Sequence, residues 1–323
     1  MRTPAGAYLY DSNTLDYLET VRCFEGEITE TSTIFAWSPD GSQFATLYSP
    51  CVGVEIRDTE TNAVEQTFPT PEDSRDCSDP FRDEPDGSGL APQQMVWSAD
   101  GRYLAVRGTI SVPTRLWDLD TGELGFSTSE ILPWDLVWSP EGHTLAAVYD
   151  CLIEQWTPDA SSFELLFEIP CNPPPNQMND DQFFDLSWSS QNQIAVSGSG
   201  RNGPSLFILD IATSEFFAYE DGIVVDDISW SPDGNILAIA SSPGIVLLDK
   251  QGNRISEITV EDPWIEMAWH PNNEWLYVNS YLYSSTQLAI YDISTGEIIN
   301  FIHSCVRWRE QDPSFDCESY IDQ

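Results

Sequence analysis

The sequence predicts an all-β fold made of repeated, four-stranded antiparallel sheets, and three observations predict it. A short phrase centred on tryptophan occurs six times, at intervals of 60, 41, 50, 42 and 39 residues. A second turn phrase, which opens with aspartate, follows most of the copies, and β-rich apolar runs lie between the two phrases. A period near 40 residues indicates an array of small units, each of which buries its apolar faces against its neighbours.

The tryptophan phrase predicts the first hairpin of each unit. Its fullest form, Trp-Ser-Pro-Asp-Gly, places proline and glycine where a tight turn needs a fixed negative φ and then a positive φ. An apolar run follows each copy, as at 43–47, 103–106 and 236–240, and predicts the second strand. The six tryptophans are Trp37, Trp97, Trp138, Trp188, Trp230 and Trp269.

The aspartate phrase predicts the second hairpin of each unit. It joins two β-rich runs, as at 118–122 between 114–117 and 123–126, and its copy in the third unit, at 157–160, is degenerate. Four antiparallel strands in about 40 residues correspond to one blade of a β-propeller. The clear copies of the phrase open with Asp58, Asp118, Asp210, Asp249 and Asp292.

One run that follows a Trp-Ser-x-Asp-Gly hairpin carries a family resemblance; it reads Arg115-Leu116-Trp117-Asp118-Leu119-Asp120-Thr121-Gly122. It resembles the WD-repeat β-propeller family, and the resemblance covers nearly the whole chain. The repeats are most similar to bacterial WD40-like propellers of the Trp-Ser-Pro-Asp-Gly type. The Gly-His pair of the eukaryotic repeat is missing, so its buried His–Asp network is not expected here. The resemblance implies a propeller but no particular function, since one fold hosts many functions.

The two ends of the chain decide the expected number of blades. Strands at 7–10 and 17–21 predict a further hairpin of the second kind. Seven such hairpins against six tryptophan hairpins predict seven blades, the last of which is shared between residues 1–23 and the tail 305–323. This closure would remove exposed sheet edges; six blades plus an N-terminal hairpin is the alternative. In either case we expect residues 1–323 to form a single domain.

The charge balance restricts the class of partner. The chain contains 53 Asp and Glu against 13 Lys and Arg, and its formal net charge is −40. Nucleic acids and anionic membrane surfaces attract basic proteins, so we expect neither as a partner. No apolar run approaches the roughly 18 residues that a membrane-spanning helix needs, so no membrane insertion is expected. The charge favours solubility, a cation or a basic protein partner.

Two long insertions each contain one cysteine. They lie at about 69–93 and 169–183, and each is preceded by a cysteine after the second strand of the same unit. In a propeller blade this turn and this insertion open on the same face, so each pair is within reach of a disulfide. We therefore expect the disulfides Cys51–Cys77 and Cys151–Cys171.

The remaining cysteines predict how the chain ends are fixed. A Cys23–Cys317 disulfide would join the two ends, whereas Cys305–Cys317 within the tail competes with it. Disulfides persist in oxidising compartments. We therefore expect an extracytoplasmic or secreted protein whose leader is not part of this sequence, and a cytoplasmic location stays open.

The position three residues before each tryptophan predicts a binding site. It starts the first strand, which is the innermost strand of a propeller blade, so these side chains would ring the mouth of the channel. They are Gln94, Asp135, Asp185, Asp227 and Glu266, and Ile34 is the exception. Beside them, Trp134, Phe184 and Trp264 would form an aromatic rim suited to cation–π contacts. A wet channel lining and ordinary core packing are the alternatives for these two sets.

These features predict a non-catalytic scaffold that binds a protein or peptide on the face bearing the acidic ring and both long loops. The sequence has only three histidines and lacks the Gly-x-Ser-x-Gly and His-Glu-x-x-His motifs. No cofactor is expected, although the acidic ring and the acidic first insertion leave calcium open as a ligand. The alternatives are a calcium-dependent propeller hydrolase, such as the sugar lactonases of this fold, and a propeller domain of a larger protein.

Overall fold

The computed structural model describes most of the chain between residues 6 and 305. The described ranges are 6–10, 17–22, 34–47, 53–68, 94–108, 113–128, 133–149, 151–158, 160, 162–170, 182–199, 204–219, 225–241, 244–260, 265–282 and 285–305. Within these ranges every regular element is a β-strand. A search of the same residues found no helix that is long and apolar enough to span a membrane.

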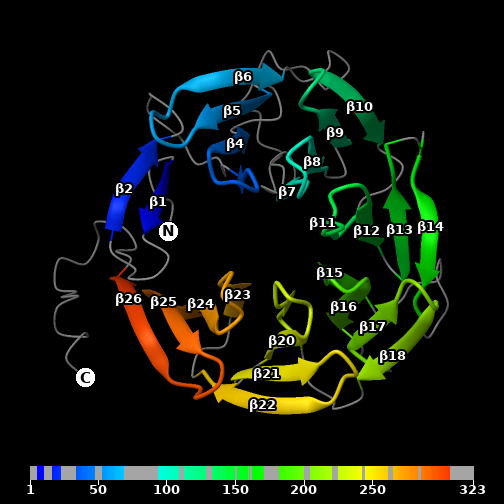
Figure 1. Cartoon of the computed structure of the whole chain (residues 1–323), viewed down its shortest axis with the longest axis vertical. Helices are drawn as coiled ribbons and strands as arrows, with labels where there is room; N and C mark the ends of the chain where they lie inside the picture. The colour runs from blue at the N-terminus through cyan, green and yellow to red at the C-terminus, as the bar shows by residue number, and fades with distance from the viewer. Residues whose placement is uncertain are drawn as a thin grey trace, which may run out of the picture. The chain divides into compact units, whose positions relative to one another are not determined.

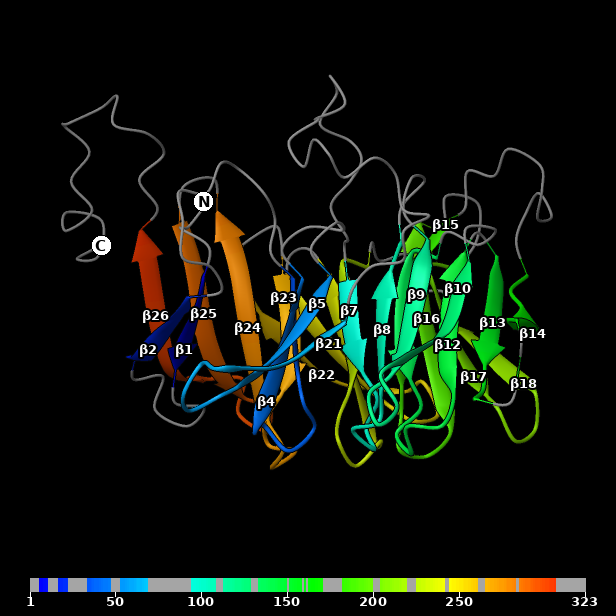
Figure 2. The same ribbon diagram turned by 90° about the horizontal axis from the view of Figure 1, so that it is seen from above.

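Six four-stranded sheets, whose strands follow one another in chain order, account for β3 to β26 (Figure 1). The first three are β3 (Ile34–Trp37), β4 (Gln43–Leu47), β5 (Val54–Asp58) and β6 (Val64–Phe68); β7 (Gln94–Trp97), β8 (Tyr103–Arg107), β9 (Thr114–Asp118) and β10 (Glu123–Thr128); and β11 (Asp135–Trp138), β12 (Leu145–Tyr149), β13 (Leu152–Trp156) and β14 (Glu164–Glu168). The other three are β15 (Gln182–Trp188), β16 (Gln193–Ser199), β17 (Leu206–Asp210) and β18 (Glu215–Tyr219); β19 (Asp227–Trp230), β20 (Ile236–Ser241), β21 (Gly244–Asp249) and β22 (Arg254–Thr259); and β23 (Ile265–Trp269), β24 (Trp275–Leu282), β25 (Ser285–Asp292) and β26 (Ile298–Cys305). Figure 2 shows the last sheet side-on, with β24, β25 and β26 as long strands beside one another.

The sheets confirm the predicted blades, each built from a first and a second hairpin. A two-stranded sheet of β1 (Gly6–Tyr10) and β2 (Tyr17–Arg22) confirms the N-terminal hairpin. Among the described residues this gives six complete blades and one extra hairpin, which fits the six-blade alternative. The strands that a seventh blade would need were expected at 306–308 and 315–321, which lie outside the described residues.

The chain divides into two compact units, and each is described by itself. Unit 2 contains Arg2–Tyr8 and Thr20–Trp188, and unit 1 contains Met1, Leu9–Glu19 and Ser189–Gln323. The prediction of a single domain over 1–323 stays a prediction.

The Trp-Ser-Pro-Asp-Gly turn is fixed by its own side chains. The Ser38 hydroxyl donates to Asp40 Oδ1 at 2.7 Å and accepts from the backbone N–H of Gln43 at 2.9 Å. The hydrogen bond from Ser38 holds the pKa of the Asp40 carboxyl below its usual value. Gly41 has a φ of 71°, as the sequence predicts for this turn. Where the phrase lacks glycine, asparagine takes the same left-handed conformation, at Asn192 (φ 61°) and Asn273 (φ 63°).

The second hairpins turn on their leading aspartate. Asp58 Oδ1 accepts the backbone N–H of Thr61 at 2.7 Å, and Asp210 Oδ1 accepts that of Thr213 at 2.9 Å. Because each of these bonds joins residues only three positions apart, it stabilises the turn locally. The predicted positions of the second hairpins are therefore confirmed for Asp58 in unit 2 and for Asp210 in unit 1.

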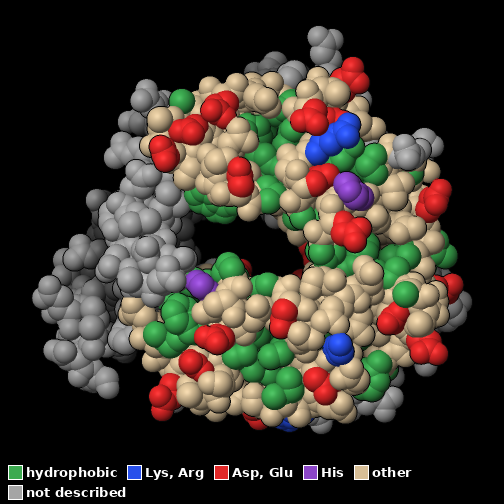
Figure 3. Space-filling view, viewed as in Figure 1, with side chains coloured by type: hydrophobic (Ala, Val, Ile, Leu, Met, Phe, Trp, Pro, Cys, Tyr) green, Lys and Arg blue, Asp and Glu red, His purple; other side chains and the backbone are tan. Residues whose placement is uncertain are grey.

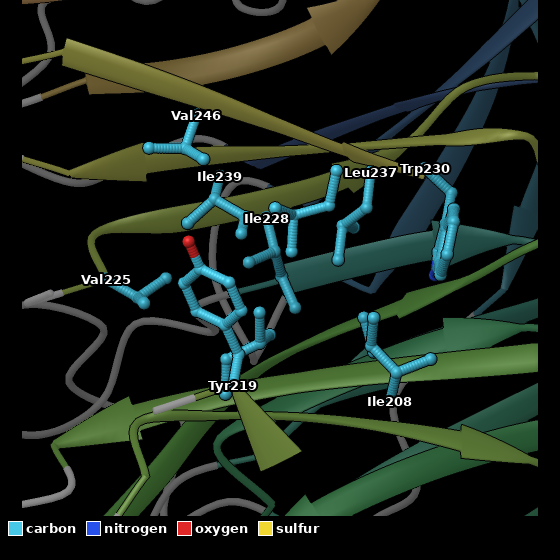
Figure 4. Packing of buried hydrophobic residues seen from close by; sticks show 11 residues of the cluster. Ile208, Tyr219, Val225, Ile228, Trp230, Leu237, Ile239 and Val246 are labelled. Carbon is cyan, nitrogen blue, oxygen red and sulfur yellow. The ribbon is translucent and has the colours of Figure 1, made fainter. Parts of the chain in front are cut away.

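Apolar side chains fill the space between consecutive sheets within each unit. In unit 1, Ile208 and Tyr219 of one sheet face Ile228, Leu237 and Val246 of the next (Figure 4). In unit 2, Tyr103 stacks on Trp138 of the following sheet, with ring centroids 5.8 Å apart. Burying each such large side chain contributes roughly 1.5–3 kcal/mol, so the sheets hold one another in place.

Candidate functional site

The predicted channel-mouth residues lie at or near the starts of first strands, as expected. Gln94, Asp135 and Asp227 are the first residues of β7, β11 and β19. Asp185 lies half-buried within β15 and Glu266 lies exposed within β23. Gln94, Asp135 and Asp185 belong to unit 2, whereas Asp227 and Glu266 belong to unit 1. The convergence of all five on one ring therefore stays a prediction.

In unit 2 these side chains form hydrogen bonds that join neighbouring sheets. Gln94 Oε1 accepts the backbone N–H of Leu136 at 3.0 Å, and Gln94 Nε2 donates to the Leu136 carbonyl at 3.2 Å and to Asp135 Oδ1. Asp135 Oδ2 in turn accepts the backbone N–H of Leu186 at 2.7 Å. The first strand β7 is thus tied to β11, and β11 is tied to β15.

Unit 1 repeats the same contact. Asp227 Oδ2 accepts the backbone N–H of Met267, two residues before Trp269, at 2.6 Å. Glu266 differs, since it lies exposed on the surface, where it accepts a 3.2 Å bond from Asn279 Nδ2, its cross-strand partner. The acid at this position of the repeat therefore has a structural role at Asp135 and Asp227.

Two of the repeat tryptophans, Trp138 and Trp269, make a second bond between sheets. Trp138 Nε1 donates to the carbonyl of Val96 at 3.1 Å, and Trp269 Nε1 donates to that of Ser229 at 2.9 Å. Each carbonyl belongs to the residue just before the tryptophan of the preceding sheet. At Trp138 and Trp269 the tryptophan phrase therefore joins two sheets in addition to forming a turn, whereas Trp97 Nε1 donates to the Gly101 carbonyl of its own turn.

Arg107 completes the surroundings of Asp135. It ends β8 opposite Gln94, and its Nη1 donates to the Pro133 carbonyl at 3.1 Å. Burial raises the pKa of the Asp135 carboxyl, and this is opposed by bonds from Leu186, Gln94 and Leu136 and by the Arg107 charge. Burial lowers the pKa of the Arg107 guanidinium, and the Asp135 charge opposes that shift.

Arg107 was not among the predicted site residues. The signal was its place at the end of the strand that follows the Trp97 hairpin, where antiparallel pairing puts it beside Gln94. The positive charge of Arg107 there partly offsets the negative charge of Asp135.

Two aromatic residues lie beside Asp135. Trp134 immediately precedes it, is 44 % exposed and meets the half-buried Phe184 edge to face, with centroids 6.0 Å apart. The backbone N–H of Trp134 donates to the Val148 carbonyl at 2.7 Å, which fixes the approach to β11. Trp264, the third residue of the predicted rim, lies outside the described residues. We call Gln94, Arg107, Trp134, Asp135 and Phe184 the Asp135 cluster.

The Asp135 cluster combines two aromatic side chains in contact with each other and polar side chains that are hydrogen-bonded. Its Asp135 oxygens face N–H donors, so the described contacts do not leave this carboxylate arranged as a free general base or as one of several cation ligands. Across the residues that the structure describes, no group of three or more His, Cys, Asp and Glu could hold a metal ion. What the cluster offers a ligand is the exposed indole of Trp134.

Acidic side chains dominate the charged surface. Figure 3 shows them scattered over the face that it draws, with few lysines and arginines among them. The net charge of −40 favours the approach of cations to the chain as a whole.

Comparison with known proteins supports the fold. No family model matches the chain, and no curated protein matches it. Among solved structures, the chain is similar to one described as Kuenenia stuttgartiensis hydrazine synthase, with a TM-score of 0.59 and 15 % identity. The match covers 80 % of this chain and 76 % of that one. At this identity the likeness concerns the fold alone, and with the six blades it defines the chain as a β-propeller.

Proposed function

We propose that this chain is a non-catalytic propeller that binds a protein or peptide, and that the Asp135 cluster is part of its binding surface. The observation that carries the proposal is the exposed indole of Trp134, held edge to face against Phe184. Exposed tryptophans on a rigid scaffold are typical anchors of protein interfaces.

We propose a basic partner. The chain carries 53 acidic against 13 basic residues, and Lys or Arg side chains stack favourably on an indole. Electrostatic attraction of this kind raises the association rate and weakens as salt screens it. The predicted binding is therefore tighter at low ionic strength.

We further propose that the repeats are of the WD40-like, Trp-Ser-Pro-Asp-Gly type and that the protein works in an extracytoplasmic compartment. The turn bonds of Ser38 and Asp40 support the first point. For the second, the support is Cys151, which is wholly buried and disulfide-bonded. Its expected partner, Cys171, lies outside the described residues, as do Cys23, Cys51, Cys77 and Cys317.

The test measures the binding of a fluorescent Lys- and Arg-rich peptide panel to the wild type and to two tryptophan variants. Trp134→Ala should weaken binding about tenfold or more, as for an interface anchor. Trp37→Ala is the matched control, since Trp37 is 42 % exposed in another sheet of the same unit, and it should bind as the wild type does.

Salt and calcium separate the proposal from its alternatives. Peptide binding should weaken as the salt concentration rises. The proposal is supported if the peptides raise the melting temperature of the protein, whereas calcium gives the same melting temperature as EDTA. An equal loss of peptide affinity in both tryptophan variants, or an affinity that does not change with salt concentration, would contradict the proposed surface.

A further inference from the structure

The fourth strand of each sheet is an edge, and these strands differ in how the edge is protected. In five of the six described fourth strands a β-bulge breaks the pairing with the third strand: β6, β10, β14, β22 and β26. A bulge twists an edge strand away from regular pairing and so discourages addition of a further strand.

Strand β18 lacks this protection. Its five residues pair with β17 in unbroken register from Leu206 opposite Tyr219 to Asp210 opposite Glu215. It is the last strand of its sheet (Figure 1), so its other side carries the alternate N–H and C=O groups that β17 does not use.

Two adjacent phenylalanines make this edge apolar. Phe216 is 46 % exposed and Phe217 is 42 % exposed, and consecutive residues of a strand point to opposite faces. Phe216 rests against Phe207 of β17, with centroids 5.9 Å apart. The ring of Phe217 packs where a side chain at Gly252 would collide with it, so it is held against the turn between β21 and β22. Both rings are thus fixed in place while still exposed.

The charge at the start of β18 indicates the kind of occupant. Asp210 and Glu215 are direct cross-strand partners, so two carboxylates lie at one end of the edge. Like charges in this relation repel each other, and a cation from a partner would relieve the repulsion. A second copy of a chain with a net charge of −40 would add to it instead.

We propose that β18 is a strand-addition site for an extended segment of a basic partner protein. The segment would pair its backbone with the outer edge of β18, cover Phe216 and Phe217 with its alternate apolar side chains, and place Lys or Arg against Asp210 and Glu215. The proposal uses other residues than the Asp135 cluster, and it does not depend on the binding proposed there.

The test uses the synthetic peptide Arg-Val-Thr-Val-Thr-Val-Arg and, as its control, the same peptide with proline in place of the central valine. Hydrogen exchange of the wild-type protein should slow at backbone amides within 215–219 when the first peptide is added, and not with the second, because proline cannot complete the pairing. Unchanged exchange within 215–219 at millimolar peptide would overturn the proposal.

Two variants localise the binding. Phe216→Ser should weaken the peptide about tenfold, whereas Ile255→Ser, which removes a 53 % exposed apolar residue from the bulged strand β22, should leave it unchanged. An equal effect of both variants would count against β18. Sedimentation of the wild type should show no self-association through this edge. If the wild type instead forms a dimer that Phe216→Ser converts to a monomer, the occupant of β18 is a second copy of the chain, and the proposal of a basic partner is wrong.

Discussion

The Asp227 carboxylate accepts a 2.6 Å hydrogen bond from the backbone N–H of Met267 and so joins β19 to β23, the first strands of consecutive sheets. Asp135 makes the same bond to Leu186 in unit 2. At Asp135 and Asp227, an acid three residues before the repeat tryptophan thus links two sheets.

Replacing Asp227 by alanine should destabilise the fold by about 1–3 kcal/mol, because the N–H of Met267 loses its acceptor. Glu266→Ala is the control at the same repeat position, and it should change stability by less than about 0.5 kcal/mol, since Glu266 is exposed. Urea unfolding of both variants measures the difference. Equal effects would show that the bond between the sheets adds nothing to stability.

The repeat architecture could be predicted because its signals are local. Pro and Gly at fixed places in the turn phrase, and Asp at the head of the second turn, dictate the hairpins through φ and side-chain bonds within a few residues. Asn192 and Asn273 even show that the degenerate copies keep the turn, because asparagine tolerates the left-handed conformation.

The role of the acidic positions could not be predicted in the same way. Whether Asp135 faces water or a backbone N–H depends on how the next sheet is placed, and Leu186 lies 51 residues further along the chain. Arg107 lies opposite Gln94 through the pairing of β7 with β8 alone, but its bond to the Pro133 carbonyl depends on how the next sheet is placed.

The titration of Asp135 should differ from that of an aspartate in a surface turn. Burial raises the pKa of Asp135, whereas the bond from Ser38 lowers that of Asp40, so the two should titrate on opposite sides of the ordinary value of about 3.9. Carboxyl carbon NMR shifts followed with pH measure both. Arg107→Met should raise the pKa of Asp135 further, because it removes a nearby positive charge.

The sign of the resulting pH dependence follows from the raised pKa. Ionised Asp135 costs stability above its folded-state pKa, and that cost disappears as pH falls through the folded-state pKa towards the unfolded value. The wild type should therefore gain stability relative to Asp135→Asn over this range on acidification. If the wild type instead becomes less stable relative to Asp135→Asn as pH falls, folding favours the ionised carboxylate.

Two glycines at the same turn position should respond differently to alanine. Gly41 and Gly142 have φ values of 71° and 77°, so alanine in either is strained by roughly 1–2 kcal/mol. A Cβ on Gly41 meets nothing within 4 Å, whereas one on Gly142 would lie 2.6 Å from the backbone nitrogen of Asp100 in the preceding sheet. Gly142→Ala should therefore cost more than Gly41→Ala in thermal unfolding. Equal costs would mean that the turn of Gly142 can move away from the turn of Asp100 at no cost in stability.

The disulfide of Cys151 should connect it to Cys171. Cys151 follows β12, is wholly buried and is disulfide-bonded, and Cys171 lies in the insertion that follows β14 of the same sheet. The closed loop would hold 21 residues, counted from 151 through 171, and a disulfide closing a loop of this size stabilises by about 2–4 kcal/mol. Non-reducing peptide mapping should yield the Cys151–Cys171 pair, and reduction should lower the melting temperature of the wild type. Cys51→Ser leaves this pair intact, so that variant should keep a reduction-sensitive melting temperature, whereas Cys171→Ser should lose the mapped pair. A map that joins Cys151 to any other cysteine would contradict the assignment.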